Sequence, residues 1–330
     1  MSARMRPIFA ASAVFRRNIG FIGIMKTKNV LGWIAVAVST LFAGIWAFWG
    51  SIENFHEGWF YESFWLNVGL MLVQYWLFAL IFTFLNLIAL RWPRFGGAFF
   101  IVAAVLIPAV WIRTFAAIVL FAVPLGAAGL LYWMGRPEPK RWACRIAVGL
   151  PLLVLFGGSL EPAWRVAGRL DDGNLGIREI AGNGVALQWA PAGPGWPQHH
   201  VDFPGGTWYD AVRICSHLNA GGTALSDSAL NIWRLPAVEE VVRTQARHGA
   251  NAGGTWDPAT GKASYRILPD KESPLWRHHS PVIYWWTATA VDEHSAYRCV
   301  YNGGVQKLPK NTRAGYLGFR AVREAPASGQ

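Results

Sequence analysis

The sequence predicts two parts: a membrane α-helical bundle of about five spanning helices, and an exported domain of α+β type. Long apolar runs fill the chain up to Leu160, whereas the remainder is mixed in polarity and rich in Gly and Pro. Late in the chain, the stretch from Ile283 to Glu324 alternates apolar and polar residues around a turn at Asn302 to Gly304. This pattern is typical of antiparallel strands with one buried face. A chain of 330 residues has room for both parts.

The charge is unevenly divided between the two parts. The whole chain carries 30 Lys and Arg residues against 19 Asp and Glu residues. Residues 1–160 hold 13 basic and 4 acidic residues, an excess of +9, whereas residues 161–330 hold 17 and 15, an excess of +2. The positive charge therefore belongs to the apolar part, where membrane orientation accounts for it. We do not expect a nucleic-acid partner.

Five apolar runs predict a transmembrane domain over residues 30–160. A spanning helix needs about 20 apolar residues to cross about 30 Å of hydrocarbon. The predicted helices lie at about 30–50, 64–90, 96–112, 114–134 and 143–160. The third run is short and contains Pro108, so a four-helix count stays open. The lipid bilayer is the predicted partner of this domain. Because the runs contain no Asp, Glu, Lys or His, we do not expect a transport function.

The loops between these runs predict the orientation. With five helices, twelve of the thirteen basic residues of this part fall on one side of the membrane, including those of the N-terminal segment, residues 1–29. Arg113 falls on the other side, together with an acidic loop that carries Glu53, Glu57 and Glu62. The positive-inside rule then places the C-terminal domain outside the cytoplasm. We expect a multi-pass protein of the inner or plasma membrane, of bacterial type. A four-helix count would place the domain in the cytoplasm.

Residues 161–183 are predicted to form a linker, and a first strand is expected from Gly184 to Pro191. Thr207 is a suitable N-cap with Asp210 three residues later, and apolar residues then recur at helical spacing. This pattern predicts a helix over residues 207–219.

A second helix is expected to start near Pro236, with Glu239 and Glu240 in its first turn, where the helix dipole favours acidic side chains. Residues 248–281 show little periodicity and many Gly and Pro residues. They predict an ordered irregular loop, and long loops of this kind often carry function.

Four motifs of the C-terminal part resemble a known superfamily. They are the helix that begins Thr207-Trp208, then Trp233-Arg234-Leu235-Pro236, then Tyr284-Trp285-Trp286-Thr287, and finally Gly318-Phe319-Arg320. In combination they resemble the C-type-lectin-like superfamily, in the branch shared by the Lcl C-terminal domain family and the sulfatase-modifying-factor, or formylglycine-generating-enzyme, family. The resemblance covers about residues 184–324 and leaves a tail of residues 325–330. It implies two helices that flank a small twisted antiparallel sheet with extensive loops.

The resemblance carries expectations for the cysteines. Formylglycine-generating enzymes use a pair of closely spaced cysteines near the end of the domain, whereas this chain has only Cys299 there. No catalytic residue is therefore predicted. The resemblance implies instead a disulfide between Cys215 and Cys299, because a C-type-lectin-like fold commonly joins its helix to its sheet at these places. In an oxidising compartment, closing a loop of roughly 84 residues would stabilise the fold by roughly 4 kcal/mol. Two free buried thiols are the alternative.

Candidate binding residues lie in the loop over residues 248–281 and in the turn at residues 292–295. Two tryptophans of the loop, and one of the Trp285-Trp286 pair, are expected to form an exposed aromatic patch for a protein, peptide or glycan ligand. The candidate residues are Trp256, Asp257, Trp276, Trp286, Asp292 and Glu293.

No metal site is predicted. The adjacent pairs His199-His200 and His278-His279 lack the spacing of metal ligands on one face of an element. A calcium ion stays an open alternative, because the loop region offers side-chain oxygens that suit it. These belong to Asn251, Asp257, Asp270 and Glu272.

The function expected from these observations is the display of a non-catalytic recognition domain from the membrane. Two alternatives stay open. One is a divergent oxidoreductase of the formylglycine-generating type that uses Cys299. The other is an accessory subunit of a membrane complex.

Overall fold

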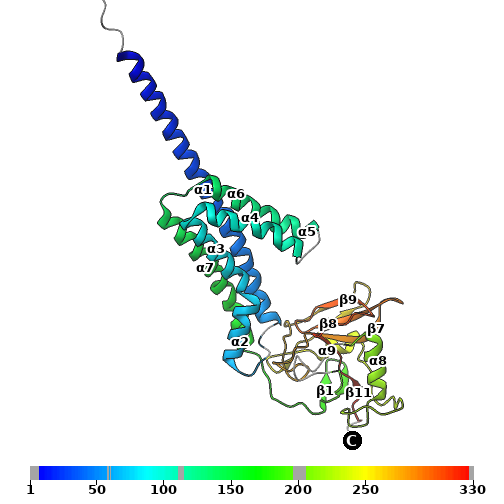
Figure 1. The fold of residues 1–330 in the computed structure, drawn as a ribbon. Coiled ribbons are helices and arrows are strands. Elements are labelled where there is room, and N and C mark those ends of the chain that lie inside the picture. Colours follow the sequence, from blue (N-terminus) through cyan, green and yellow to red (C-terminus); the bar gives the residue numbers. More distant parts are fainter. Residues whose placement is uncertain (1–6, 58, 60, 111–114, 196–205, 327–330) are drawn as a thin grey trace, which may run out of the picture. The chain divides into compact units, whose positions relative to one another are not determined.

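The computed structural model describes residues 7–57, 59, 61–110, 115–195 and 206–326, and the chain divides into two compact units (Figure 1). The helical unit comprises Met1–His56 and Gly69–Pro162. The β-rich unit comprises Glu57–Val68 and Ala163–Gln330. The division into a helical part and an α+β part confirms the coarse prediction.

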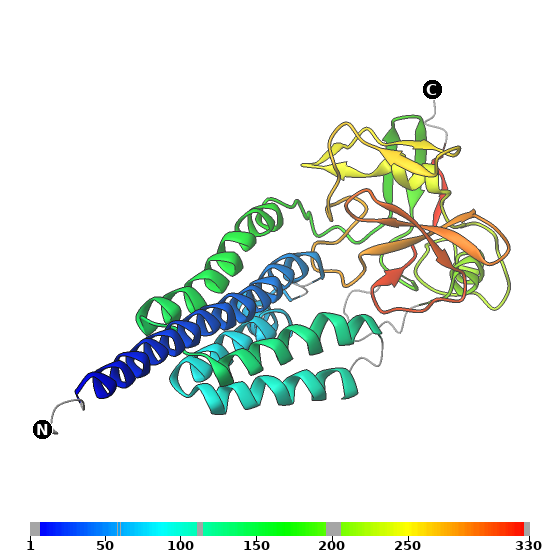
Figure 2. The ribbon, with the colours of Figure 1, turned by 90° about the horizontal axis from the view of Figure 1, so that it is seen from above.

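Helices account for most of the described residues of the first unit, and the helix over Phe64–Leu70 begins in residues of the second. α1 runs without a break through this unit (Figure 2). The elements are α1 (Pro7–Glu57), α2 (Phe64–Leu70), the π-helix η1 (Met71–Tyr75), α3 (Leu77–Arg91), α4 (Pro93–Val110), α5 (Phe115–Ala117), the π-helix η2 (Ile118–Ala122), α6 (Val123–Met134) and α7 (Lys140–Ala167).

Within the part of the chain that the structure describes, three helical segments are long and apolar enough to cross a membrane: Lys26–His56, Pro93–Val110 and Lys140–Ala167. Two further helical pieces, Phe64–Tyr75 (α2 and η1) and Leu77–Arg91 (α3), meet at a bend of 59°. Together they make a fourth span if they cross the membrane as one helix. The helix over Ile118–Met134 is apolar but shorter. The predicted helices at about 30–50 and 143–160 are therefore present, the predicted helix at 64–90 is broken at Trp76, and the predicted count of five stays a prediction. Arg113, on which the orientation depends in part, lies outside the described residues.

Small residues let the helices of the first unit approach one another closely. A Cβ atom added to Gly97 of α4 would lie 2.7 Å from the carbonyl oxygen of Gly129 on α6. A Cβ atom added to Gly129 would likewise lie 2.7 Å from the carbonyl oxygen of Gly97. An added Cβ at Gly96 would lie 2.3 Å from the Cα of Ala89 on α3. Close backbone approach at small residues is typical of helix packing in membranes.

Among its described residues, the β-rich unit contains two sheets, two short hairpins and two complete helices. The sheets have the strand orders β1-β2-β11 and β10-β7-β8-β9, and the hairpins are β3-β4 and β5-β6. The strands are β1 (Arg178–Gly182), β2 (Val185–Trp189), β3 (Ala246–Arg247), β4 (Ala250–Asn251), β5 (Thr255–Asp257), β6 (Lys262–Ser264), β7 (Tyr284–Ala290), β8 (Ser295–Val300), β9 (Val305–Pro309), β10 (Leu317–Gly318) and β11 (Val322–Glu324). The helices are α8 (Trp208–His217) and α9 (Val238–Thr244).

Both predicted helices of this unit are formed. At the start of α8, the Thr207 hydroxyl accepts a hydrogen bond from the Asp210 amide and the Asp210 carboxylate accepts one from the Thr207 amide, both at 3.1 Å. This reciprocal cap confirms the predicted N-terminus. α9 begins at Val238, two residues after Pro236, and its Glu240 carboxylate accepts from the Ala237 amide at 2.7 Å.

The predicted linker and loop hold more regular structure than expected. α7 extends to Ala167 and β1 begins at Arg178, so the connection is shorter than residues 161–183. The stretch over residues 248–281 contains β4, β5 and β6, which are two or three residues long. Strands of this length are too short to show alternation in a sequence.

Neighbouring tryptophans of β7 face opposite sides of its sheet, and both are buried. Trp285 packs in one hydrophobic cluster with Trp276 and Cys299, whereas Trp286 packs in another with Trp233 and Phe319. Both faces of this sheet are therefore covered, instead of the single buried face that the alternation predicts.

Candidate functional site

A groove of about 420 Å³ lies on the β-rich unit, where four chain segments meet. One segment follows α7, another is the start of β1, the third is the turn between β3 and β4, and the fourth precedes β7. We call it the Arg178 groove. Its lining residues are Leu170, Asp171, Asp172, Arg178, Gly249, Ser273 and Pro274.

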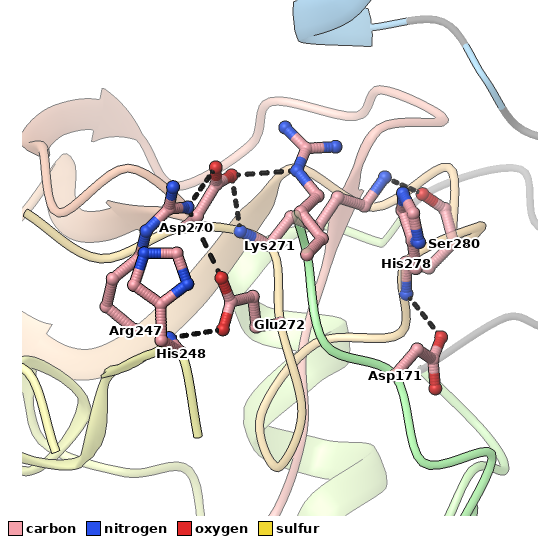
Figure 3. A network of polar contacts seen from close by, with 9 residues as sticks. Asp171, Arg247, His248, Asp270, Lys271, Glu272, His278 and Ser280 are labelled. Carbon is pink, nitrogen blue, oxygen red and sulfur yellow. Dashed lines mark hydrogen bonds and ion pairs between the residues drawn. The ribbon is translucent and has the colours of Figure 1, made fainter. Parts of the chain in front are cut away.

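A buried ionic network, drawn in Figure 3, is formed by residues that neighbour the groove residues in the sequence. Asp270 accepts from Arg169 at 3.0 Å and from Arg247 at 2.5 Å, and Arg247 also lies 3.3 Å from Glu272. The Arg169 and Asp270 side chains are only 3% and 1% exposed. Buried charges need such partners, because each would otherwise pay a large desolvation penalty. The network holds the segments that carry Leu170, Gly249 and Ser273.

Lys271 points away from this network, and its amine donates to the carbonyl oxygen of Ser280 (Figure 3). Complete burial and the nearby charge of Arg169 hold its pKa well below the usual value, against the opposing effect of Asp270. The amine is thus a buried hydrogen-bonding group and is not presented to a substrate.

Two carboxylates form one wall of the groove. Asp172 lies 2.7 Å from Arg178 and accepts from the Ser273 hydroxyl at 3.1 Å. Burial alone would raise the pKa of Asp172, but the hydrogen bond from Arg178 and further donors outweigh it and lower that pKa. Asp171 accepts from the backbone amide of His278 at 2.8 Å. The wall therefore presents two fixed hydrogen-bond acceptors beside a guanidinium.

Two of the predicted binding tryptophans are in the core, so the expected exposed aromatic patch is wrong for them. Trp276 is 2% exposed and packs on Trp285 with 4.9 Å between ring centroids. Trp286 is 0% exposed, and its indole donates to the carbonyl oxygen of Gly206 at 3.0 Å. Trp256 is half-buried against Tyr297. The reason is that both faces of the sheet are covered.

The predicted acidic binding residues lie in turns and outside the groove. Asp257 accepts from the Ala259 amide and the Thr260 hydroxyl, and Asp292 accepts from the amides of His294 and Ser295. Glu293 is exposed in the second of these turns. The two aspartates therefore stabilise turns, and the structure does not bring the three acids together.

The predicted disulfide between Cys215 and Cys299 is not formed, because the structure has both as free, buried thiols. Cys215 packs in the cluster of Trp233, whereas Cys299 packs in the cluster of Trp285. Burial raises the pKa of both thiols, so both stay protonated. A buried, protonated Cys299 is unsuited to act as the nucleophile or metal-binding thiolate of an oxidoreductase.

The four residues considered for calcium have other partners. Asp270 and Glu272 are held by Arg247, Asp257 is held in its turn, and Asn251 accepts from the Gly253 amide. Within the described residues, no group of three or more His, Cys, Asp or Glu side chains is arranged to hold a metal ion. The pair His199-His200 lies outside those residues.

Sequence reasoning missed the groove because its first wall was assigned to the linker. The run Arg169-Leu170-Asp171-Asp172 follows the last apolar helix almost directly. Three charged residues in four positions at this point, in a segment otherwise expected to be a spacer, are the signal that could have indicated the site.

Comparisons with protein-family models, with curated proteins and with solved structures found no match to this chain.

Proposed function

We propose that the protein is a multi-pass protein of the inner or plasma membrane that displays its β-rich unit outside the cytoplasm as a non-catalytic recognition domain. The Arg178 groove is its binding site. The observation that carries the proposal is the contrast between the groove and the core. The groove presents hydrogen-bonding side chains at the surface, whereas Lys271, Cys215 and Cys299 are buried.

The membrane location is supported by the three apolar helices and by the charge of the loops. An excess of +9 in residues 1–160 is concentrated in the predicted cytoplasmic segments. Exposed apolar side chains cover these helices, among them Leu41, Val105 and Leu153. A helix surface of this kind suits lipid and is unfavourable in water.

The proposed C-type-lectin-like fold is supported by the meeting of its motif residues in one hydrophobic cluster. Cys215 of α8, Trp233 and Leu235 before α9, Trp286 of β7 and Phe319 after β10 pack together. Four segments that are distant in the sequence thereby share a core, as the resemblance implies.

A recognition role is supported by the chemistry of the groove. Arg178 donates, Asp171 and Asp172 accept, and Leu170 and Pro274 supply apolar surface. Binding sites combine a largely apolar lining with a few fixed polar groups in this way. The network of Arg169, Arg247 and Asp270 holds these groups in place before a ligand arrives, which lowers the entropic cost of binding.

A photo-crosslinking amino acid at Leu170 tests this proposal in membranes of the native host. Leu170 lines the groove and is 48% exposed, and Leu225 is a matched control because it is 50% exposed and does not line the groove. We expect an adduct at Leu170 that is absent at Leu225 and that weakens when Asp172→Ala is added. Equal labelling at both positions, or none at Leu170, would contradict a recognition role of the groove.

A further inference from the structure

One edge of the three-stranded sheet is open. In the order β1-β2-β11, β1 pairs with β2 on one side only. The two strands are joined by Asn183 and Gly184 at φ values of 50° and 79°, as in a type I′ turn. Gly182 and Val185 therefore form the hydrogen-bonded pair next to the turn. From there, non-hydrogen-bonded and hydrogen-bonded residue pairs alternate along the two strands.

This alternation determines which backbone groups of β1 point away from β2. Arg178, Ile180 and Gly182 bond toward β2, so the N–H and C=O groups of Glu179 and Ala181 point outward. Both residues are exposed. Among the described residues, no backbone hydrogen bond other than the β1-β2 ladder involves them. An exposed row of unpaired backbone groups is a template for another strand.

The open edge leads into the Arg178 groove. Arg178 is the first residue of β1 and also lines the groove. An extended segment that pairs with Glu179 and Ala181 would thus continue past Arg178 into the groove. A space of about 420 Å³ is large enough to take one of its side chains.

The charges at this place favour a basic side chain. Arg178 is paired with Asp172 at 2.7 Å, whereas the ion pairs of the described residues include neither Asp171 nor Glu179. The Asp171 carboxylate, which lines the groove, is therefore left to attract a cation. Leu170 and Pro274 offer apolar contact for the stem of a lysine or arginine.

We propose that the edge of β1 binds an extended peptide segment of a partner protein, with a basic side chain of that segment in the Arg178 groove. The proposal rests on the proposed function and names the class of its ligand. In strand addition of this kind, backbone hydrogen bonds provide the affinity and a side-chain pocket provides the specificity. A second copy of this chain fits less well, because pairing β1 with itself would bring the Glu179 and Asp172 carboxylates of both copies near each other.

The test uses the full chain in lipid nanodiscs and a labelled probe peptide, acetyl-Thr-Val-Lys-Val-Thr-amide. Its binding is compared with that of the same peptide with Glu in place of Lys, and with that of a peptide whose backbone amides are N-methylated. We expect the Lys peptide to bind about tenfold or more tighter than the Glu peptide. N-methylation should abolish binding, because it removes the donors that pair with a strand.

Two variants complete the test. Ala181→Pro removes one outward N–H group without touching the ladder to β2, and should abolish binding of the Lys peptide. Asp171→Asn should reduce the preference for Lys over Glu, whereas the control Asp292→Asn should leave it unchanged. Hydrogen exchange of β2 and β11 shows whether Ala181→Pro is folded. If it is not, N-methylation tests strand pairing on the native protein.

Several results would overturn the inference. These are equal binding of the Lys and Glu peptides, unchanged binding of the N-methylated peptide, and a dimer of the native protein that Ala181→Pro dissociates. A Leu170 adduct that persists in Ala181→Pro would leave the recognition role standing and reject only the strand addition. Loss of the Leu170 adduct in the native protein would reject the recognition role itself.

Discussion

Arg169 Nε lies 3.0 Å from Asp270 Oδ1, and both side chains are almost completely buried. Arg169 follows the end of α7 by two residues, and Asp270 precedes the groove residue Ser273 by three. The pair therefore ties the entry of the chain into the β-rich unit to the wall of the Arg178 groove.

Replacing Asp270 by Asn should destabilise the β-rich unit strongly. The change removes the carboxylate partner of the buried Arg169 and one of the two carboxylates beside Arg247, and breaking a buried ion pair costs about 3–5 kcal/mol. Hydrogen exchange of peptides that cover β7 and β8, in the full chain, measures this loss. Asp257→Asn is the control, because Asp257 lies in an exposed turn where a change of about 0.5 kcal/mol or less is expected. Similar effects of the two variants would contradict a stabilising role of the network.

His278 should make the stability of the unit depend on pH below about 6.5. Burial, followed by the charge of Arg169, lowers its pKa in the folded state to about 4. As the pH falls, the unfolded state therefore binds a proton first, and stability decreases until the folded-state pKa is reached. The full loss is about 3 kcal/mol, and no loss arises above the unfolded-state value.

His278→Gln should flatten this part of the profile, measured as the hydrogen-exchange stability of β7 between pH 4 and pH 7. His294→Gln, in an exposed turn, should leave the slope as it is in the native protein. A slope that survives in His278→Gln would assign the pH dependence to other groups.

All three cysteines should react as free thiols. Alkylation of the unreduced protein in denaturant is expected to label Cys144, Cys215 and Cys299, whereas Cys215 and Cys299 should stay unlabelled in the folded protein because both are buried. Mass spectrometry of the peptides counts the labels. A linked peptide that contains Cys215 and Cys299 would show that the disulfide forms after all.

Lys271→Met should be tolerated. The side chains are similar in volume, and the low pKa of Lys271 shows that burial opposes its charge, so removing the amine relieves a cost. We expect unfolding stability equal to or above that of the native protein. Lys271→Ala is the comparison and should lose about 2–5 kcal/mol, since it leaves a cavity. A loss of the same size in Lys271→Met would show that the bond to Ser280 stabilises the fold.

Local features of the fold were predictable from the sequence. The cap of α8 was predicted because Thr207 and Asp210 lie within one turn of each other and need no other part of the chain. The apolar helices were predicted for a similar reason, since each depends on a continuous run of residues.

The groove and the core required information that is spread over the chain. Arg169 and Asp270 are 101 positions apart, so no local pattern shows that they meet. Trp286 looked available because alternation indicates two faces of a strand but does not show what covers each of them. The pairing of Cys215 with Cys299 was carried over from a resemblance, whereas the structure packs them in separate clusters.

The proposed display of the β-rich unit outside the cytoplasm is tested by the side of the membrane on which this unit lies. A single cysteine is placed at Glu293, or at Lys28 as the control, in a Cys144→Ala background, and intact spheroplasts are treated with a membrane-impermeant maleimide. Both positions are exposed, and the remaining native cysteines are buried. We expect Glu293→Cys to be labelled before lysis and Lys28→Cys only after it. Labelling of Glu293→Cys only after lysis would place the unit in the cytoplasm and contradict its proposed display outside.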